Sequence, residues 1–547
     1  HILTVFYRGE TMLVHSWLKA LPEAVIRQWP LLCAMYANTI AHAGGFQSAA
    51  LLQTSHWLEV ANQALRGQGV ERNESGKLHQ PADHLTQSFI ATTRAYLALW
   101  RGDSPQTVIE LARQALADLP PTDKEPLDLN FLRLRSGLSN NIGFSYLMLG
   151  DEEAAIQAYA EAQRIGKSCG DLLNMYSAIA RQVFILRRHG RLPEAATLCQ
   201  KAMNATETGT KPERSIPYLG VIYLALGQIL LEWNDLAAAK NALTKSLELS
   251  RLMAETDAQL ESSISLTHIK LAEGDVQSAL DLLDQIDLVS EKAKILVPAW
   301  RARIHIAQSN QHPEALNKAL QWAEGKVLRE CDPFWPAIEP LTLARVLIAQ
   351  CRSASHSATA HPPDLNPLLQ FLDLQIQTAE KGNWVERMIE LRVLQALTWH
   401  VQKHLPEALD SLHNALDLAE PGGYMRLFLD EGLPIRRLLS KIKVDNNRIN
   451  RYIGKLLVAA GETGPVSRLI PDQQPLIEPL SMRELEVLRL LVLGSSNAEI
   501  AQELVITLNT TKKHVTHIFE KLGATNRAEA AQRAMDLGLI PPSSHPT

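Results

Sequence analysis

The spacing of apolar residues follows the period of an amphipathic helix from the N-terminus to about residue 420. Stretches rich in Ala and Leu alternate with short turns, and the alternation of apolar and polar residues that is typical of strands is almost absent. Since each such helix has an apolar side to bury, the pattern predicts an all-α fold in which helices pack one on the next.

The turns between these helices share a register. In seven places an alanine stands five residues after the turn residue: Gly45 and Ala50, Gly150 and Ala155, Gly190 and Ala195, Asn234 and Ala239, Gly274 and Ala279, Asn310 and Ala315, and Lys403 and Ala408. Gly102 marks a further turn, with Thr107 in the alanine position. From Gly102 to Gly274 the turns are 48, 40, 44 and 40 residues apart. These distances exceed the ~34 residues of a strict tetratricopeptide repeat (TPR).

An alanine at this point lets the two helices of a hairpin approach closely, and only neighbouring hairpins can cover the apolar side that remains. We therefore expect residues 1–420 to form a TPR-like superhelix with a long concave surface for an effector or partner. Such an array can also be pure scaffold. The tryptophans near turns or helix ends are more typical of core between helices than of a ligand site: Trp57, Trp100, Trp233, Trp322 and Trp399.

Two interruptions suggest boundaries. Residues 352–367 read as a loop inside the array, because they combine Ser, Ala and His with a Pro pair. Pro421, Gly422 and Gly423 end the repeats, after which residues 424–460 are helical and 461–479 are rich in Gly, Pro and Gln. We assign residues 421–475 to a helical connector and flexible linker.

Four short capped helices are predicted in residues 476–541. Helix starts are indicated by capping boxes at Ser481 with Glu484 and at Ser496 with Glu499, by Asn526 with Glu529, and by Thr507. Gly494 and Gly523 stand where helices should stop. This order of starts and stops leaves little room for an arrangement other than four short helices.

The third helix has two distinct faces. One face, which should pack on the preceding helices, carries Leu508, Thr511, Val515, Ile518 and Leu522. The opposite face carries Asn509, Lys512, Lys513, Thr516 and Glu520. Lysine can reach phosphates or guanine edges, and Asn or Thr can bind bases or backbone, so this face is the candidate DNA-reading surface. A buried Thr511 hydroxyl needs a partner, for which the carbonyl of Thr507 is suitably placed.

Residues 480–540 resemble the LuxR-type helix-turn-helix domain. The motifs that carry the resemblance are L-S-M-R-E-L-E-V-L, S-N-A-E-I-A, T-K-K-H, K-L-G and R-A-E-A. The resemblance implies that residues 508–522 read DNA, with Lys512, Lys513 and Thr516 in the reading positions, and that residues 527–537 serve dimerisation. Further contacts are expected from Asn509, Thr510, Ser496 and Asn497, through side chains and helix N-terminal amides. Thr511, Ala498 and His517 depart from the family pattern, which leaves the target sequence open.

The order of the parts extends the resemblance to the large MalT-like regulators. G-Y-M-R and F-L-D-E-G stand at 423–426 and 428–432, between the repeats and the LuxR-type end. That family usually has an ATPase domain before the repeats. No G-x-x-x-x-G-K-[ST] loop occurs here, so we expect no cofactor in this chain, and ATP only if a preceding ATPase domain exists. Because the chain begins with His1 inside a helical pattern, we interpret it as a fragment.

Composition excludes several classes. The net charge of -5 gives no field over the whole chain that favours nucleic acid or membrane, and residues 476–540 hold seven Lys or Arg against eight Asp or Glu. Five scattered cysteines without a C-x-x-C pair indicate free thiols in a reducing cytoplasm. We expect no membrane span. The pairs His514 with His517 and His400 with His404 are weak metal candidates, and no catalytic motif is present.

We conclude from the sequence that the chain is a transcriptional regulator, with activation favoured over repression. Its expected partners are double-stranded DNA, RNA polymerase, a small-molecule or protein effector at the repeats, and a second copy of itself. The alternative is a TPR-like scaffold whose terminal module binds protein instead of DNA.

Overall fold

The computed structural model describes residues 2–7, 10–44, 48–67, 81–120, 128–207, 219–253, 256–288, 290–309, 312–330, 337–354, 363–442, 446–461, 482–492, 494–504, 507–522, 524 and 526–536. In this part of the chain every regular element is a helix, which confirms the predicted all-α class. The chain divides into two compact units, His1–Ala460 and Gly461–Thr547. Each unit is described by itself.

The described residues of the first unit begin with α1 (Ile2–Tyr7), α2 (Thr11–Ala20), α3 (Glu23–Ile26), α4 (Pro30–Gly44), α5 (Ser48–Gly67), α6 (Pro81–Arg101) and α7 (Pro105–Asp118). A continuous apolar core joins them to the start of α8. Phe6 from α1 meets Phe89 from α6 edge to face, with ring centroids 5.9 Å apart. Helix α1 thus packs on α6.

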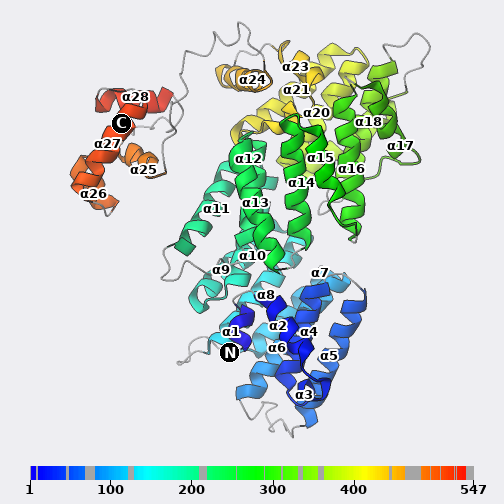
Figure 1. Ribbon diagram of the computed structural model, residues 1–547, viewed down its shortest axis with the longest axis vertical. Coiled ribbons are helices and arrows are strands. Elements are labelled where there is room, and N and C mark those ends of the chain that lie inside the picture. Colours follow the sequence, from blue (N-terminus) through cyan, green and yellow to red (C-terminus); the bar gives the residue numbers. More distant parts are fainter. Residues whose placement is uncertain are drawn as a thin grey trace. The chain divides into compact units, whose positions relative to one another are not determined.

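The middle of the unit is a stack of helical hairpins (Figure 1). Its helices are α8 (Leu129–Met148), α9 (Glu152–Cys169), α10 (Leu172–Arg188), α11 (Leu192–Glu207), α12 (Leu219–Glu232), α13 (Leu236–Met253), α14 (Thr256–Ala272), α15 (Val276–Asp284), α16 (Glu291–Gln308) and α17 (Pro313–Ala323). Each even-numbered helix packs on its odd-numbered partner and on the next even-numbered helix. This is the stacked arrangement predicted from the repeats.

The register of turns and alanines has a direct structural basis. All seven alanines are buried, five of them completely. The turn residues Gly102, Gly150, Gly190, Asn234, Gly274 and Lys403 have φ between 62° and 80°, the left-handed conformation that ends a helix. Gly45 and Asn310 lie outside the described residues. Close approach also requires Gly227 of α12, where a Cβ would lie 2.6 Å from Leu243 Cγ of α13.

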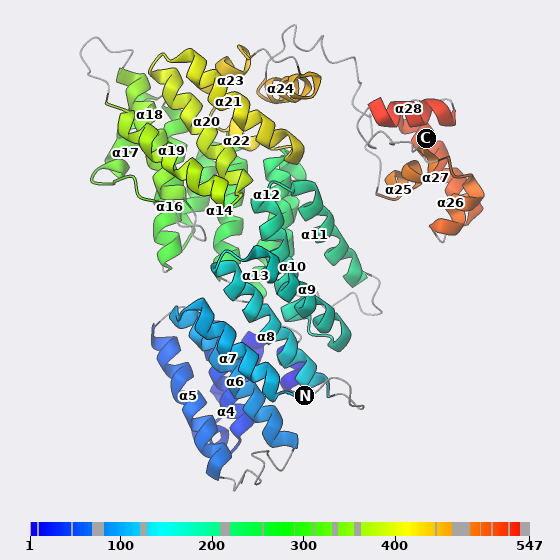
Figure 2. The same cartoon turned by 180° about the vertical axis from the view of Figure 1, so that it is seen from behind.

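The unit ends with α18 (Ile338–Ala354), α19 (Asn366–Lys381), α20 (Val385–Val401), α21 (Leu405–Ala419), η1 (Glu420–Gly422), α22 (Arg426–Leu429), α23 (Leu433–Leu439) and α24 (Asn447–Ala459). Seen from behind, α22 lies close to α20 and α12 (Figure 2), and it packs on both. The segment that the sequence assigned to a connector is therefore folded against the repeats as far as α24.

The second unit contains α25 (Met482–Val492), α26 (Asn497–Glu503), α27 (Leu508–Leu522) and α28 (Arg527–Asp536). Val487, Leu491, Ile500, Ile518 and Ala530 belong to its apolar core, to which all four helices contribute. The unit therefore has its own core. Among the described residues no helix is both long enough and apolar enough to cross a membrane.

Candidate nucleic-acid interface

Helix α27 buries one face almost as predicted. Thr511, Val515, Ile518 and Leu522 are at most 8% exposed. The prediction for Leu508 is wrong, because its side chain is 44% exposed. Leu508 is the first residue of α27, and the Cα–Cβ bonds of a helix tilt toward its N-terminus. Its side chain is therefore directed past the end of the core.

The buried threonine has the partner predicted for it. The Thr511 hydroxyl donates to the carbonyl oxygen of Thr507 at 3.3 Å, and Thr511 is completely buried. This bond satisfies a polar group that would otherwise be costly inside the core. A threonine can therefore stand at a position where the resemblance leads one to expect valine.

The opposite face of α27 is open to solvent. Asn509, Lys512, Lys513, Thr516 and Glu520 are all exposed. Lys512 and Lys513 form no ion pair with any described residue. The Thr516 hydroxyl donates to the carbonyl oxygen of Lys512 at 3.0 Å, so its lone pairs remain to accept hydrogen bonds. The face thus offers two cations, one amide, one hydroxyl acceptor and the carboxylate of Glu520.

At the N-terminus of each of α26 and α27, the helix's own cap binds one amide of the first turn. The Ser496 amide donates to Glu499 Oε2 at 2.6 Å, and the Glu499 amide donates to Ser496 Oγ, which completes the predicted capping box. The Thr510 amide donates to Thr507 Oγ1 at 3.1 Å. The predicted contacts of Ser496 and Thr510 with DNA must therefore use side-chain atoms in this conformation. Two other predicted features lie outside the described residues. These are Ser481, the predicted capping partner of Glu484, and the predicted helix stop at Gly523.

Arg527 of α28 supports the start of α26. Its guanidinium donates to Ser495 O at 2.6 Å and to Asn497 Oδ1 at 2.7 Å. The amide oxygen of Asn497 thereby accepts a hydrogen bond, and its NH₂ group is the donor of the side chain. This contact was not predicted from the sequence, where Arg527 stood only in the R-A-E-A motif.

A second unpredicted contact holds the far end of α27. Lys521 Nζ donates to Glu484 Oε2 of α25 at 2.9 Å, and the Glu484 side chain is only 5% exposed. His517 Nδ1 lies 4.0 Å from the other oxygen of Glu484. A buried carboxylate needs such a partner, so Lys521 is a structural cation of the module. No group of three or more potential metal ligands occurs among the described residues.

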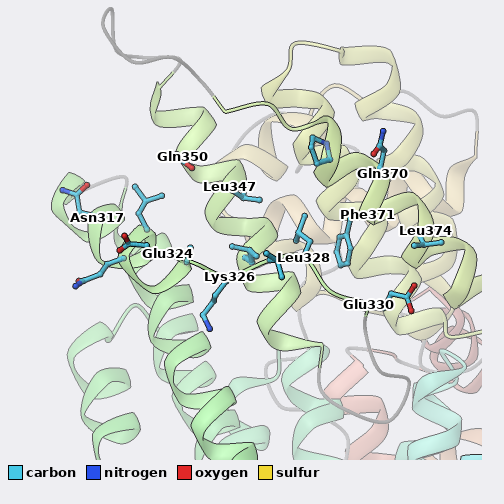
Figure 3. A pocket seen from close by; sticks show the side chains of 16 residues that line it. Asn317, Glu324, Lys326, Leu328, Glu330, Leu347, Gln350, Gln370, Phe371 and Leu374 are labelled. Atoms are coloured by element: carbon cyan, nitrogen blue, oxygen red, sulfur yellow. The ribbon is translucent and has the colours of Figure 1, made fainter.

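The repeat unit has an apolar groove of about 1030 Å³ between α17, α18 and α19 (Figure 3). Helix α18 packs on α16, α17 and α20, whereas α19 packs on α20, so this hairpin is open. Leu347 and Phe371 lie on its walls, and Val327 and Leu374 are 61% and 47% exposed. The only sequence signal for the groove was the interruption at 352–367, part of which lies outside the described residues.

Two family matches cover most of the chain. Residues 88–445 match the family described as "MalT-like TPR region". The chain belongs to the MalT-like TPR family. Residues 478–534 match "Bacterial regulatory proteins, luxR family", which confirms the LuxR-type resemblance of the second unit. The MalT-like match ends at residue 445, after α23 and within the segment assigned to the connector.

The curated relatives are transcriptional regulators. The "HTH-type transcriptional regulator MalT" of Vibrio cholerae serotype O1 is 24% identical over 465 residues, covering 81% of this chain and 49% of the relative. Its namesake in Serratia proteamaculans is 22% identical over 559 residues, covering 98% of this chain and 57% of the relative. The chain spans about half the length of the curated relatives it matches.

One solved structure is also similar, the apo form of the quorum sensor NprR from B. thuringiensis. It is 11% identical, with a TM-score of 0.34, and covers 76% of this chain and 96% of that one. The likeness is too weak to support an inference about this chain.

Proposed function

We propose that this chain is a DNA-binding transcriptional regulator, and specifically an activator, that inserts α27 into a major groove. The observation that carries the proposal is the exposed, lysine-bearing face of α27, opposite a face that is buried in the core of the module. Helix-turn-helix proteins read DNA with such a helix. The match to the luxR family and the regulators among the relatives support it.

Four exposed residues of α27 have roles that follow from their chemistry. Lys512 and Lys513 neutralise phosphates or donate to guanine O6 and N7. Asn509 is suited to adenine, since its amide can donate and accept together. Thr516 accepts a hydrogen bond, because its own proton is held by the Lys512 carbonyl.

The proposal includes three kinds of partner. Since the module carries about as many acidic as basic residues, two copies on adjacent half-sites would supply the affinity that one copy lacks. As an activator, the DNA-bound protein would contact RNA polymerase. An effector, either a small molecule or a protein, would act on the repeat unit. Within this chain the mechanism uses no cofactor, and ATP would enter only through a preceding ATPase domain.

The test is selection of bound sequences from random duplexes by the full chain. The proposal predicts a recurring motif, and fluorescence anisotropy on that motif should give tight binding. Asn509→Ala should relax the preference at one base pair while retaining phosphate contacts, at a cost of about 1 to 3 kcal/mol on the preferred base. No enriched motif and no binding would overturn the proposal.

The competing function, a scaffold whose terminal module binds protein, gives a different result. A protein-binding module would select no duplex sequence. Substitutions on the exposed face of α27 would then leave DNA affinity unchanged at its nonspecific level. The selection therefore decides between the two functions.

A further inference from the structure

Residues 422–431, which we call the latch, pack on helices from much earlier in the chain. The indole Nε1 of Trp233, at the end of α12, donates to Gly422 O at 2.8 Å, although the two residues are 189 positions apart. A Cβ on Gly422 would lie 2.7 Å from the carbonyl oxygen of Gly190. The latch thus lies against the turns that follow α10 and α12.

Backbone and tyrosine contacts continue this attachment. The Met425 amide donates to Glu232 O at 2.9 Å, and the Leu427 amide donates to the Glu232 carboxylate at 3.1 Å. The hydroxyl of Tyr424, a completely buried residue, donates to Arg187 O at 3.1 Å. These bonds satisfy backbone groups that an isolated strap would leave to water.

The next contacts are between charged side chains. Arg426 binds Asp430 within the latch and donates to Asn234 Oδ1 at 3.1 Å. His268 Nε2 of α14 lies 2.5 Å from Asp430 Oδ2. Asp430 therefore joins the latch to a third repeat helix through partners with little exposure.

A cluster of four charges attaches the end of the latch to three further helices. Arg345 of α18 lies 2.6 Å from Glu431 and 3.1 Å from Glu390 of α20. Arg303 of α16 lies 3.2 Å from the same Glu390. The Arg345 and Glu431 side chains are 11% and 9% exposed. Separating them would leave Arg345 with Glu390 but would leave the Glu431 carboxylate without this partner and with little access to water.

The latch also contacts α24, the second helix after it. The Tyr452 hydroxyl of α24 donates to Tyr424 O, and the rings of Phe428 and Tyr452 meet edge to face at 6.2 Å. Tyr452 is 6% exposed. The attachment of α24 to the unit therefore depends in part on the latch being in place.

We propose that residues 422–431 form a releasable latch, which stays docked while α12, α14 and α18 keep their present spacing and frees α24 when that spacing changes. The reason is geometric. Partners from several repeats must hold Asp430 and Glu431 at once, and hydrogen bonds and ion pairs of this length tolerate little displacement. A ligand that binds more tightly to a stack of different curvature therefore shifts the equilibrium toward the undocked latch. The size of the shift is the difference between its binding free energies for the two states. The effect of release on transcription rests on the proposed function, whereas the release itself does not.

Hydrogen exchange measured by mass spectrometry on the full chain tests the latch without DNA. Asp430→Asn removes the charge that faces His268 and Arg426 at nearly constant size. We expect it to speed amide exchange about tenfold in both the latch and α24, since one charged hydrogen bond is lost. Helix α9 should exchange as in the wild type. The matched control is Asp410→Asn on α21, where the carboxylate is exposed and the latch should be unaffected.

A second variant separates the docking of the latch on the repeats from the attachment of α24 to the latch. Tyr452→Phe removes only the hydroxyl that binds Tyr424 O, so α24 should exchange faster while the latch does not. Faster exchange in the latch of Asp430→Asn with α24 unchanged would overturn the coupling. Faster amide exchange in α9 of Asp430→Asn would mean that the substitution has disturbed the whole unit. Tyr452→Phe then decides, because unchanged exchange in its α24 contradicts the proposal. None of these results depends on DNA binding.

Discussion

Lys521 Nζ lies 2.9 Å from Glu484 Oε2, which ties the last turn of α27 to the first turn of α25. This pair holds the end of α27 against the start of α25. Lys521→Met keeps the length of the side chain but leaves the Glu484 carboxylate without this partner. We expect the module to lose about 1 to 3 kcal/mol of stability. Thermal unfolding measured on the full chain checks this, and an unchanged transition of the second unit would contradict it.

Thr511→Val tests the buried hydroxyl. Valine has nearly the same shape and needs no hydrogen-bond partner, so the Thr507 carbonyl loses only a bond of 3.3 Å. We expect a change in the free energy of unfolding of less than about 1.5 kcal/mol in either direction, because a hydrogen bond between neutral groups contributes no more than that. DNA affinity should be unchanged, since the side chain does not reach the exposed face. A loss of binding with a folded module would show that Thr511 has another role.

We expect the stability that Asp430 of the latch contributes to depend on pH. Burial raises the pKa of Asp430, but the charges and hydrogen bonds of His268 and Arg426 outweigh burial and hold the pKa well below its usual range. Asp430 therefore stabilises the fold above the pKa of about 3.9 that it has in the unfolded chain, and this stability is lost as the pH falls. The buried Glu232 also faces this carboxylate.

The measurement is urea unfolding of the wild type and Asp430→Asn between pH 3 and pH 6. The difference between them should be largest near pH 5 and shrink by about 1 kcal/mol per pH unit below about pH 4. A difference that stays constant down to pH 3 would mean that Asp430 is not the titrating group.

The buried cysteines should be inert in the native state. Cys33 and Cys199 are completely buried free thiols, and burial raises the pKa of Cys33 to about 11 and that of Cys199 to about 12. Since the thiolate is the reactive form, neither should be alkylated by iodoacetamide at pH 8 until the chain unfolds. Mass spectrometry of labelled peptides with and without guanidinium checks this. Rapid native labelling of Cys199 would contradict its burial.

The repeats and caps could be predicted because their signals are local. The turn at Gly150 and the alanine at Ala155 are five residues apart, and Ser496 and Glu499 are three apart. Each pair reports the geometry of its own segment. Helical spacing wrongly predicted that Leu508 is buried, because the spacing of apolar residues continues past the point where the core ends.

The latch and the contacts of Lys521 and Arg527 could not be predicted from the sequence. Trp233 and Gly422 meet across 189 residues, and Lys521 and Glu484 across 37. No period or cap relates such positions, because their distance is set by how whole helices stack. The G-Y-M-R and F-L-D-E-G motifs were visible only as a resemblance, and their contacts came from the fold. The DNA-binding roles of Lys512, Lys513 and Thr516 remain predictions.

The most direct measurement is the salt dependence of DNA binding by Lys512→Ala/Lys513→Ala, using the duplex obtained by selection. If both lysines contact phosphates, the slope of log K against log salt concentration should become shallower by about 1.8, or about 0.9 for each lost contact. The control Lys201→Ala/Lys240→Ala removes the same charge from exposed positions on α11 and α13 and should keep the wild-type slope. Weakened binding with a shallower slope is the predicted result. An affinity and slope equal to those of the wild type would contradict the assignment of α27 as the reading helix.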